Sequence, residues 1–241
     1  MGKSFFNEEL NANNAFEVEV NIERLQECEI IKKSYLWGTN KDIFSPVDFS
    51  SIKPSWGGDM EWISANNMNT YNLFLKGFKS FGLEKIFQDI IEYENQLRLY
   101  AGFFVKRSSS KKNFHLDWNG SLKNNAFTLL TPIYQEEDAL HLLYKDISGE
   151  ECKYKYEIGK GILFGSDFNH STEAGTSSSS SILLCFQFGT DLAEYNRGIH
   201  DAMGSQSSFM ILPDGRCVKH EKNKVKVKTY SVPLDLNDLK F

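Results

Sequence analysis

The segment NFHLDWNG, at residues 113–120, places a histidine and an aspartate two positions apart. On an extended chain, side chains with this spacing leave the same face. His115 and Asp117 would therefore offer one imidazole and one carboxylate side by side, as two arms of a chelate. Mixed nitrogen and oxygen ligands suit iron, manganese or zinc. Taken alone, such a pair is more often a surface feature than a ligand set, so a metal site needs a third ligand from elsewhere.

A third ligand is offered by the segment GKGILFGSDFNHS, at residues 159–171. It reads as a glycine turn, an apolar strand and then His170 just past the end of that strand. If the strands of this region close into a barrel, His170 would join His115 and Asp117. Two histidines and one carboxylate leave coordination positions open on one side of a metal, which is the usual ligand set of non-haem Fe(II) oxygenases.

The elements that would position these ligands are short apolar stretches separated by turns. Their regular spacing predicts an all-β sandwich or barrel. The predicted strands are 97–108, 113–118, 126–134, 139–146, 153–159, 161–167 and 180–189.

The residues before the barrel follow a different pattern. The alternation in 16–22 predicts a strand, whereas apolar residues recur at helical spacing in 67–81 and in 82–96. After the barrel come a polar segment and, at 208–220, a hairpin with a PDG turn. Helices followed by strands predict one α+β domain, mainly β, built around a barrel.

We therefore expect a single domain that comprises the whole chain. Its parts are an N-terminal strand with supporting helices (1–96), the barrel core (97–189) and a C-terminal extension with a hairpin (190–241).

The composition restricts the functional classes. A net charge of −5 argues against broad binding to nucleic acid, and the lysine-rich stretch 219–228 reads as a solvated hairpin. No apolar run reaches the roughly 18–20 residues of a membrane span. The four cysteines form no CxxC pair, which favours a reducing, cytoplasmic setting and argues against a disulfide framework. The oligomeric state cannot be read from the sequence.

Across roughly residues 97–189 the chain resembles the Fe(II)/2-oxoglutarate-dependent oxygenases, within their prolyl-hydroxylase-like branch. The resemblance lies in the HLD motif, the strands around it and the GILFGSDFNHS segment. It implies a double-stranded β-helix (jelly-roll) barrel buttressed by the N-terminal helices. It also implies that His115, Asp117 and His170 bind Fe(II), that 2-oxoglutarate and O2 are cosubstrates, and that the protein is a dioxygenase. The carboxylate ligand implies hydroxylation and not halogenation, with a small-molecule or peptidyl substrate.

One position departs from the family pattern. The family has a basic residue, usually arginine, early on the strand after the second histidine, where it pairs with the distal carboxylate of 2-oxoglutarate. Counting without gaps places Ser179 there. A serine hydroxyl carries no charge, and a carboxylate buried without a cation is costly. Three alternatives stay open: the cation comes from Arg107, Lys123 or Arg98; the cosubstrate differs or is absent; or the protein binds metal as a cupin-like jelly-roll that does not turn over 2-oxoglutarate.

Other pocket candidates follow from strand position. On an alternating strand Ser179 and Ser181 would share the face of Leu183 and Cys185, which makes both of them candidates to line the pocket. The resemblance places Thr128 near the cosubstrate carboxylate. Trp118, which follows the HxD motif, and Tyr134 are candidates for contact with the substrate.

Overall fold

The computed structural model describes nine stretches of the chain. They are residues 4–5, 14–21, 48–53, 60–107, 111–135, 139–175, 181–204, 206–220 and 228–230. For residues 4–5, 106–107 and 228–230 only the backbone is described.

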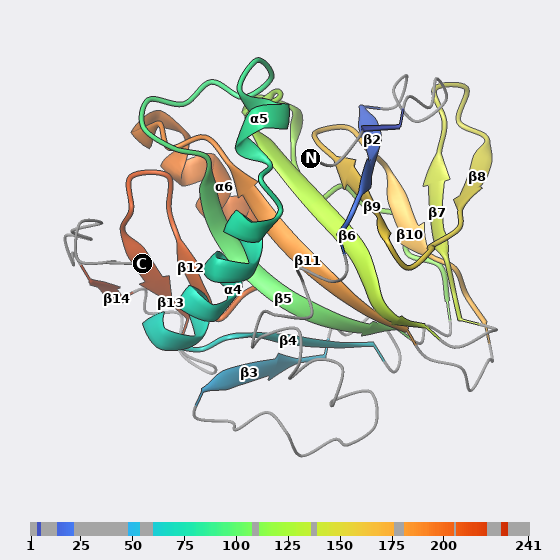
Figure 1. Cartoon of the computed structure of the whole chain (residues 1–241), viewed down its shortest axis with the longest axis horizontal. Coiled ribbons are helices and arrows are strands. Elements are labelled where there is room, and N and C mark those ends of the chain that lie inside the picture. Colours follow the sequence, from blue (N-terminus) through green and yellow to red (C-terminus); the bar gives the residue numbers. More distant parts are fainter. Residues whose placement is uncertain are drawn as a thin grey trace.

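A large antiparallel sheet forms the frame of the molecule (Figure 1). Its strands, in spatial order, are β1 (Ser4–Phe5), β2 (Ala15–Glu19), β9 (Lys160–Phe164), β6 (Ala126–Gln135), β11 (Ser181–Gly189), β5 (Arg98–Arg107), β4 (Glu61–Ala65) and β3 (Phe49–Ile52). The central strand β11 is buried along its whole length, which explains its almost unbroken apolar sequence.

A smaller antiparallel sheet lies beside the large one and carries the second histidine. It consists of β10 (His170–Thr172), β7 (Leu142–Lys145) and β8 (Glu151–Tyr154). Aromatic and aliphatic side chains from the two sheets, among them Tyr144, Tyr154, Phe164 and Leu183, form a common core. The predicted order of strands around a barrel is therefore present.

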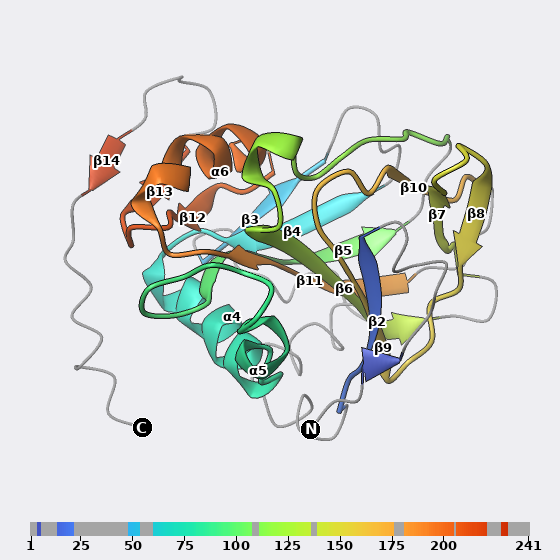
Figure 2. The ribbon, with the colours of Figure 1, turned by 90° about the horizontal axis from the view of Figure 1, so that it is seen from above.

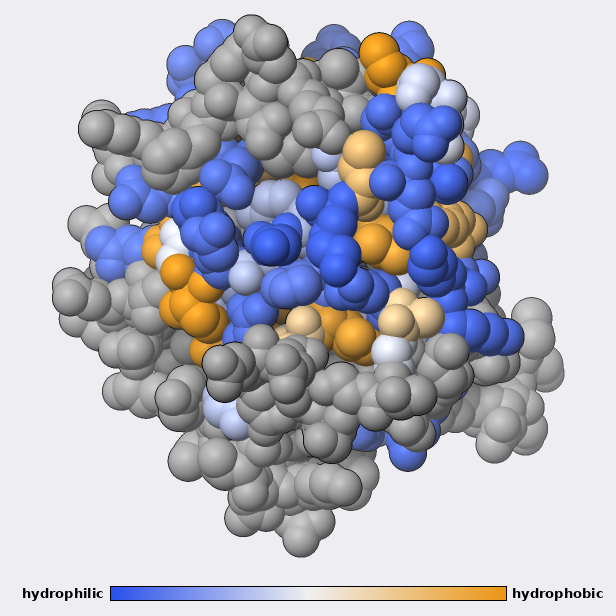
Figure 3. All heavy atoms as spheres, turned by 90° about the vertical axis from the view of Figure 1, so that its right-hand side faces the viewer, coloured by the Kyte–Doolittle hydropathy of each residue, from blue (hydrophilic) through white to orange (hydrophobic). Residues whose placement is uncertain are grey.

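The outer surface of the small sheet is solvated. Lys112 pairs with Glu151 at 2.6 Å, and Lys153 pairs with Glu173. Figure 3 views this side of the molecule and shows a largely hydrophilic surface broken by hydrophobic patches. The alternating exposure along β8 follows from having one face in the core and one in water.

Helix α4 (Met68–Ser80) covers the face of the large sheet that lies away from the small sheet (Figure 2). Asn67 and Thr70 form a capping box at its start. Its apolar stripe reaches the sheet through aromatic pairs such as Phe74 with Phe104, whose ring centroids are 5.3 Å apart. The helix approaches so closely that a Cβ on Gly102 would lie 2.6 Å from the Phe74 ring.

The second predicted helix, 82–96, is wrong in length. The structure has only one turn there, α5 (Glu84–Phe87). The last part of the predicted span has competing acceptors, because the N–H of Glu92 donates to Oδ1 of Asn125 at 3.1 Å and the N–H groups of residues 94–96 donate to the carboxylate of Asp191 at 2.7–3.0 Å. Those N–H groups are not available for helical hydrogen bonds, so the helix cannot extend to residue 96.

The C-terminal part adds a short helix and a third sheet. The polar segment of the sequence contains two helical elements, η2 (Ala193–Tyr195) and α6 (Asn196–Met203). The predicted hairpin is confirmed as β12 (Phe209–Ile211) and β13 (Cys217–Lys219), which continue into β14 (Lys228–Tyr230). Within the described residues, no helix is long and apolar enough to span a membrane.

Candidate metal centre

The two candidate histidines are brought together by their own backbones. The predicted strand 113–118 is wrong, since this segment makes only an isolated antiparallel bridge between His115 and His170. In that bridge each residue donates its N–H to the carbonyl of the other, at 2.9 and 3.0 Å. The two imidazole centroids consequently lie 4.5 Å apart.

Local hydrogen bonds orient both imidazoles in the same way. The Nδ1 of His115 is 2.8 Å from the Asn113 carbonyl, and the Nδ1 of His170 is 3.0 Å from the Phe168 carbonyl. A carbonyl oxygen only accepts, so each Nδ1 carries a proton, and Nε2 is the nitrogen of each ring that could bind a metal. This second hydrogen bond is the usual way in which proteins orient a metal-binding histidine.

The two Nε2 atoms converge on one carboxylate oxygen. Oδ1 of Asp117 lies 3.6 Å from Nε2 of His115 and 3.8 Å from Nε2 of His170. The candidate ligand atoms of the three residues all lie within 4.8 Å of one another. Two nitrogen donors and one oxygen donor at these separations fit a single transition-metal ion of the kind held by a facial triad.

The second carboxylate oxygen of Asp117 is held by Thr128 on β6. The Thr128 hydroxyl donates to Oδ2 at 2.8 Å and accepts a hydrogen bond from the Trp118 indole at 3.0 Å. Trp118 is only 1% exposed and packs edge-on against Tyr100. Trp118, Thr128 and Asp117 thus form a chain that fixes the carboxylate, with Oδ1 left for the metal.

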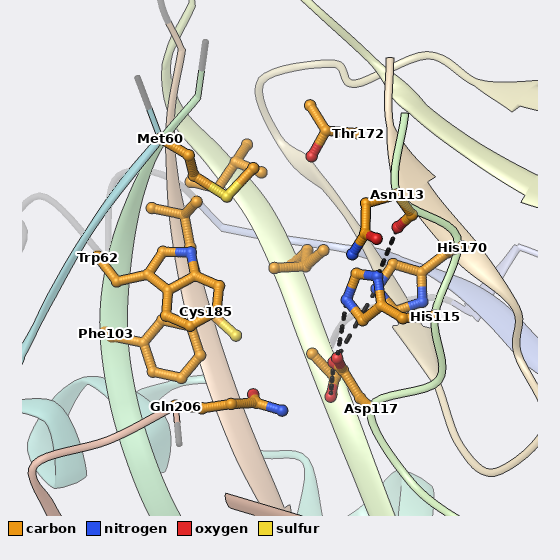
Figure 4. Close-up of a pocket in the computed structure, with 14 residues that line it drawn as sticks. Met60, Trp62, Phe103, Asn113, His115, Asp117, His170, Thr172, Cys185 and Gln206 are labelled. Atoms are coloured by element: carbon orange, nitrogen blue, oxygen red, sulfur yellow. Dashed lines mark hydrogen bonds and ion pairs between the residues drawn. The ribbon is translucent and has the colours of Figure 1, made fainter. Parts of the chain in front are cut away.

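A pocket of about 200 Å³ opens in front of the three ligands. Figure 4 shows His115, Asp117 and His170 on one side of it and Met60, Trp62, Phe103 and Cys185 on the other. Its remaining lining residues are Val105, Asn113, Thr128, Leu130, Thr172, Leu183 and Gln206. The candidate ligands therefore line a partly open pocket.

The predicted cosubstrate residues lie at different places. Ser181 is fully buried at the start of β11, on the face of Leu183 and Cys185, and its hydroxyl has no hydrogen-bond partner among the described residues. Its backbone pairs with Arg107, of which only the backbone is described. Lys123 is exposed at the end of η1 (Gly120–Leu122), away from the pocket lining. Ser179 lies outside the described residues.

The two predicted substrate residues lie outside the pocket lining. Trp118 is buried behind Thr128, as described above. Tyr134 packs with the core on the helix-covered face of the large sheet. The pairing of β6 with β11 shifts register there, because Ile182 pairs with Tyr134 and Leu183 pairs with Pro132. The extra residue, Ile133, reverses the alternation and moves Tyr134 to the other face.

Sequence reasoning missed most of the wall opposite the ligands. Met60 and Trp62 precede the barrel, and Gln206 follows α6, so neither region carried a motif. Phe103 lay on a predicted strand, but nothing in an almost continuous apolar stretch indicates which face borders a pocket.

Comparison with known proteins supports the fold and leaves the reaction undetermined. No protein-family model matches the chain, and no curated protein matches it. Several solved structures, however, are similar to it. HygX from Streptomyces hygroscopicus, with nickel and 2-oxoglutarate bound, has a TM-score of 0.55 at 10% identity, over 77% of this chain and 87% of that one.

Two further solved structures have a similar fold. SnoN, a non-heme alpha-ketoglutarate-dependent epimerase from nogalamycin biosynthesis, has a TM-score of 0.53 at 9% identity, over 76% of this chain and 80% of its own. An oxidoreductase of the 2OG-Fe(II) oxygenase family from Burkholderia pseudomallei has a TM-score of 0.50 at 10% identity, over 74% of this chain and 86% of its own. The chain therefore has the jelly-roll fold of Fe(II)/2-oxoglutarate oxygenases, as the sequence predicted.

Proposed function

We propose that this protein is a non-haem Fe(II)- and 2-oxoglutarate-dependent dioxygenase that hydroxylates a small-molecule or peptidyl substrate. One observation carries the proposal. The Nε2 atoms of His115 and His170 converge on Oδ1 of Asp117, while each Nδ1 is held by a backbone carbonyl. The same fold in HygX and SnoN supports it.

The donor set favours Fe(II) over a closed structural zinc site. Structural zinc takes four protein ligands, whereas the described residues supply three here. All three approach from one side, since His115 and His170 are neighbours in a bridge and Asp117 lies two residues from His115. The pocket on the other side leaves room for cosubstrate and O2.

Ser181 and Arg107 are the residues that we assign to 2-oxoglutarate. The buried Ser181 hydroxyl lacks a partner among the described residues, and a carboxylate oxygen would satisfy it. Arg107 is the register partner of Ser181 in the pairing of β5 with β11. This register supports Arg107 as the cation that pairs with the carboxylate of 2-oxoglutarate. The other two candidates are poorly placed, because Lys123 is exposed and Arg98 donates to the Pro213 carbonyl at the opposite end of β5.

When bound, Fe(II) and 2-oxoglutarate would supply the oxidation of a C–H bond by O2, with decarboxylation of the keto acid to succinate. The protein's own task is positional. Thr128 holds Asp117 so that one carboxylate oxygen remains for the metal. The apolar wall of Met60, Trp62 and Phe103 limits the access of water to the reacting atoms.

A second candidate is a metal-binding jelly-roll that does not turn over 2-oxoglutarate. The described residues that line the pocket include no lysine and no arginine, and a carboxylate held there without a cation would be costly. The two candidates differ in whether Arg107 reaches the pocket.

Anaerobic titration with Fe(II) and 2-oxoglutarate, followed by exposure to O2, tests the proposal. We expect a weak visible absorption band from the Fe(II)–keto acid complex and then succinate formation, even without substrate. Asp117→Ala should abolish both signals. Metal binding without the band and without succinate would favour the second candidate.

A matched pair of variants tests the cation. Arg107→Gln should raise the KM for 2-oxoglutarate at least about tenfold, because a charged hydrogen bond to a carboxylate contributes about 1.5–3 kcal/mol. Lys123→Gln removes the same charge from an exposed position and should leave the KM unchanged. Equal KM values in both variants would contradict the assignment of Arg107.

A further inference from the structure

The pocket has two chemically unlike sides. His115, Asp117 and His170 supply the polar side, with Asn113 beside them, whereas Met60, Trp62 and Phe103 supply an apolar wall opposite (Figure 4). A ligand that reaches the metal centre from this direction must lie against that wall.

The wall offers an aromatic surface. Met60 and Phe103 are 2% and 4% exposed, while Trp62 is only partly buried and can still make contacts. The Trp62 and Phe103 ring centroids are 6.0 Å apart, with the planes tilted by 36°. Such a surface favours a ring or a compact hydrocarbon, since aromatic groups pack well at offset or tilted angles.

The wall also selects against charge. Among the described residues that line the pocket, Asp117 and the two histidines belong to the metal centre, and the one other ionisable group is the Cys185 thiol, which is 2% exposed; none of the described lining residues is a lysine or an arginine. An ion placed against Met60, Trp62 and Phe103 would lose its hydration without gaining a partner. The group that enters should therefore be uncharged.

Gln206 supplies one polar contact at the edge of the wall. Its backbone N–H donates to the Met203 carbonyl at 2.8 Å, and its Oε1 accepts from Nε2 of the fully buried Gln187 at 2.7 Å. These two bonds fix the amide. Its own Nε2 carries two protons but has only one contact among the described residues, the Ala202 carbonyl at 3.4 Å.

The amide nitrogen of Gln206 is therefore a donor that remains available to a ligand. In Figure 4 the side chain extends from the apolar wall toward the side on which Asp117 lies, with the amide at its tip. The Oε1 of Gln187, behind it, is buried without a partner in the described part of the chain. Gln206 is partly buried and Gln187 fully buried, so this amide pair beside the pocket has unused hydrogen-bonding capacity that a polar ligand atom or a water would complete.

We propose, building on the function proposed above, that this wall is the substrate subsite and that it takes an uncharged ring or compact hydrocarbon group bearing one oxygen acceptor. Trp62, Phe103 and Met60 hold the apolar body, and the Gln206 amide donates to the oxygen. The cavity of about 200 Å³ must also admit the cosubstrate, so only the reacting part of a larger substrate enters.

Three fluorinated probes of similar size separate these features by ligand-observed ¹⁹F NMR on the full chain. They are 4-fluoroacetophenone, with an oxygen acceptor, 4-fluoroethylbenzene, without one, and 4-fluorobenzoate, which is charged. Binding is measured with and without Mn(II) and 2-oxoglutarate. With Mn(II) and 2-oxoglutarate both bound, so that the cosubstrate occupies the metal and the proposed Arg107 contact, we expect the two neutral probes to bind and the benzoate to bind at least about tenfold more weakly, because the wall offers it no cation.

Two classes of variant assign the contacts. Gln206→Leu should raise the ketone Kd about fivefold relative to the ethylbenzene Kd, the effect of one net hydrogen bond. Gln206→Glu keeps an acceptor for Gln187 but removes the donor, and should raise the ketone Kd relative to the ethylbenzene Kd in the same way. It replaces the leucine variant if that variant fails to fold. Trp62→Ala should weaken both neutral probes by similar factors. Gln206 variants that leave the ratio of the two Kd values unchanged would overturn the role of Gln206.

The failure of this inference is distinguishable from the failure of the proposed function. Bound Mn(II) should enhance the ¹⁹F relaxation of the ketone, which places the probe beside the three ligands. If the protein binds Mn(II) and 2-oxoglutarate but not the neutral probes, or if 2-oxoglutarate displaces them, the substrate subsite is wrong and the oxygenase assignment stands. If the probes bind as expected but no metal or keto acid does, the oxygenase assignment fails and the chemistry of the wall stands.

Discussion

Thr128 provides a direct test of how the metal centre is held. Its hydroxyl donates to Oδ2 of Asp117 at 2.8 Å and accepts from the Trp118 indole at 3.0 Å. Thr128→Val keeps the shape of the side chain and removes both bonds. Thr128→Ser is the matched control, because it keeps the hydroxyl and removes one methyl group.

Two effects of Thr128→Val can be estimated separately. The Trp118 N–H, in a side chain only 1% exposed, would be left without a partner, which costs about 1–3 kcal/mol of folding free energy. For a chain of this size, each kcal/mol lowers the Tm by about 2–4 °C. Loss of a hydrogen bond to a metal-binding carboxylate weakens metal binding by about 10–100-fold.

The assay is anaerobic titration of each variant with Mn(II) or Fe(II), together with thermal unfolding of the metal-free protein. Thr128→Val should lose both metal affinity and Tm. Thr128→Ser should lose about 1 kcal/mol of stability for the missing methyl group and keep its metal affinity.

A folded Thr128→Val protein with wild-type metal affinity would refute this reasoning. It would mean that Asp117 is positioned by its backbone alone, or that it is not a ligand. A loss of Tm without any loss of affinity would give Thr128 a purely structural role beneath Trp118.

Three further predictions concern the metal, the fold and pH. Metal at one hundred times its Kd should stabilise the wild type by about 2.7 kcal/mol, and thermal melts of His170→Ala should show no such gain. Gly102→Ala should lower the free energy of unfolding in urea by about 1–3 kcal/mol, because the new Cβ would lie 2.6 Å from the Phe74 ring. An unchanged urea midpoint would show that α4 can move aside. Burial raises the pKa of Asp191, but the N–H donors of residues 94–96 outweigh burial and hold that pKa below 3.8. Asp191→Asn should therefore be less stable than the wild type at pH 7, and the gap in Tm should close as the pH falls below 3.8; a gap that is independent of pH would contradict this.

The sequence was sufficient to indicate the three candidate ligands because their chemistry is local. The spacing of His115 and Asp117, and the position of His170 after an apolar strand, depend on residue types that can be read directly. Strand periodicity likewise predicted β5, β6, β9 and β11 close to their observed bounds. In each case a short apolar run bounded by turn residues reports that the strand is buried, whichever partner buries it.

Elements that depend on a distant partner were predicted less well. The helix expected over 82–96 is limited by Asp191, about a hundred positions along the chain, which takes the N–H groups that a helix would use. The strand expected over 113–118 reduces to a single bridge with His170. Neither competitor is visible within the segment itself.

The sequence by itself determined which side chains can bind a metal and which stretches are strands. Only the tertiary structure decided what surrounds the candidate metal site. A single extra residue at Ile133 moved Tyr134 to the other face, and the fold brought Trp62 and Gln206 to the pocket from outside the barrel segment. The physical reason is that periodicity records local burial, whereas register, bulges and the packing of remote segments are set by contacts that no local pattern encodes.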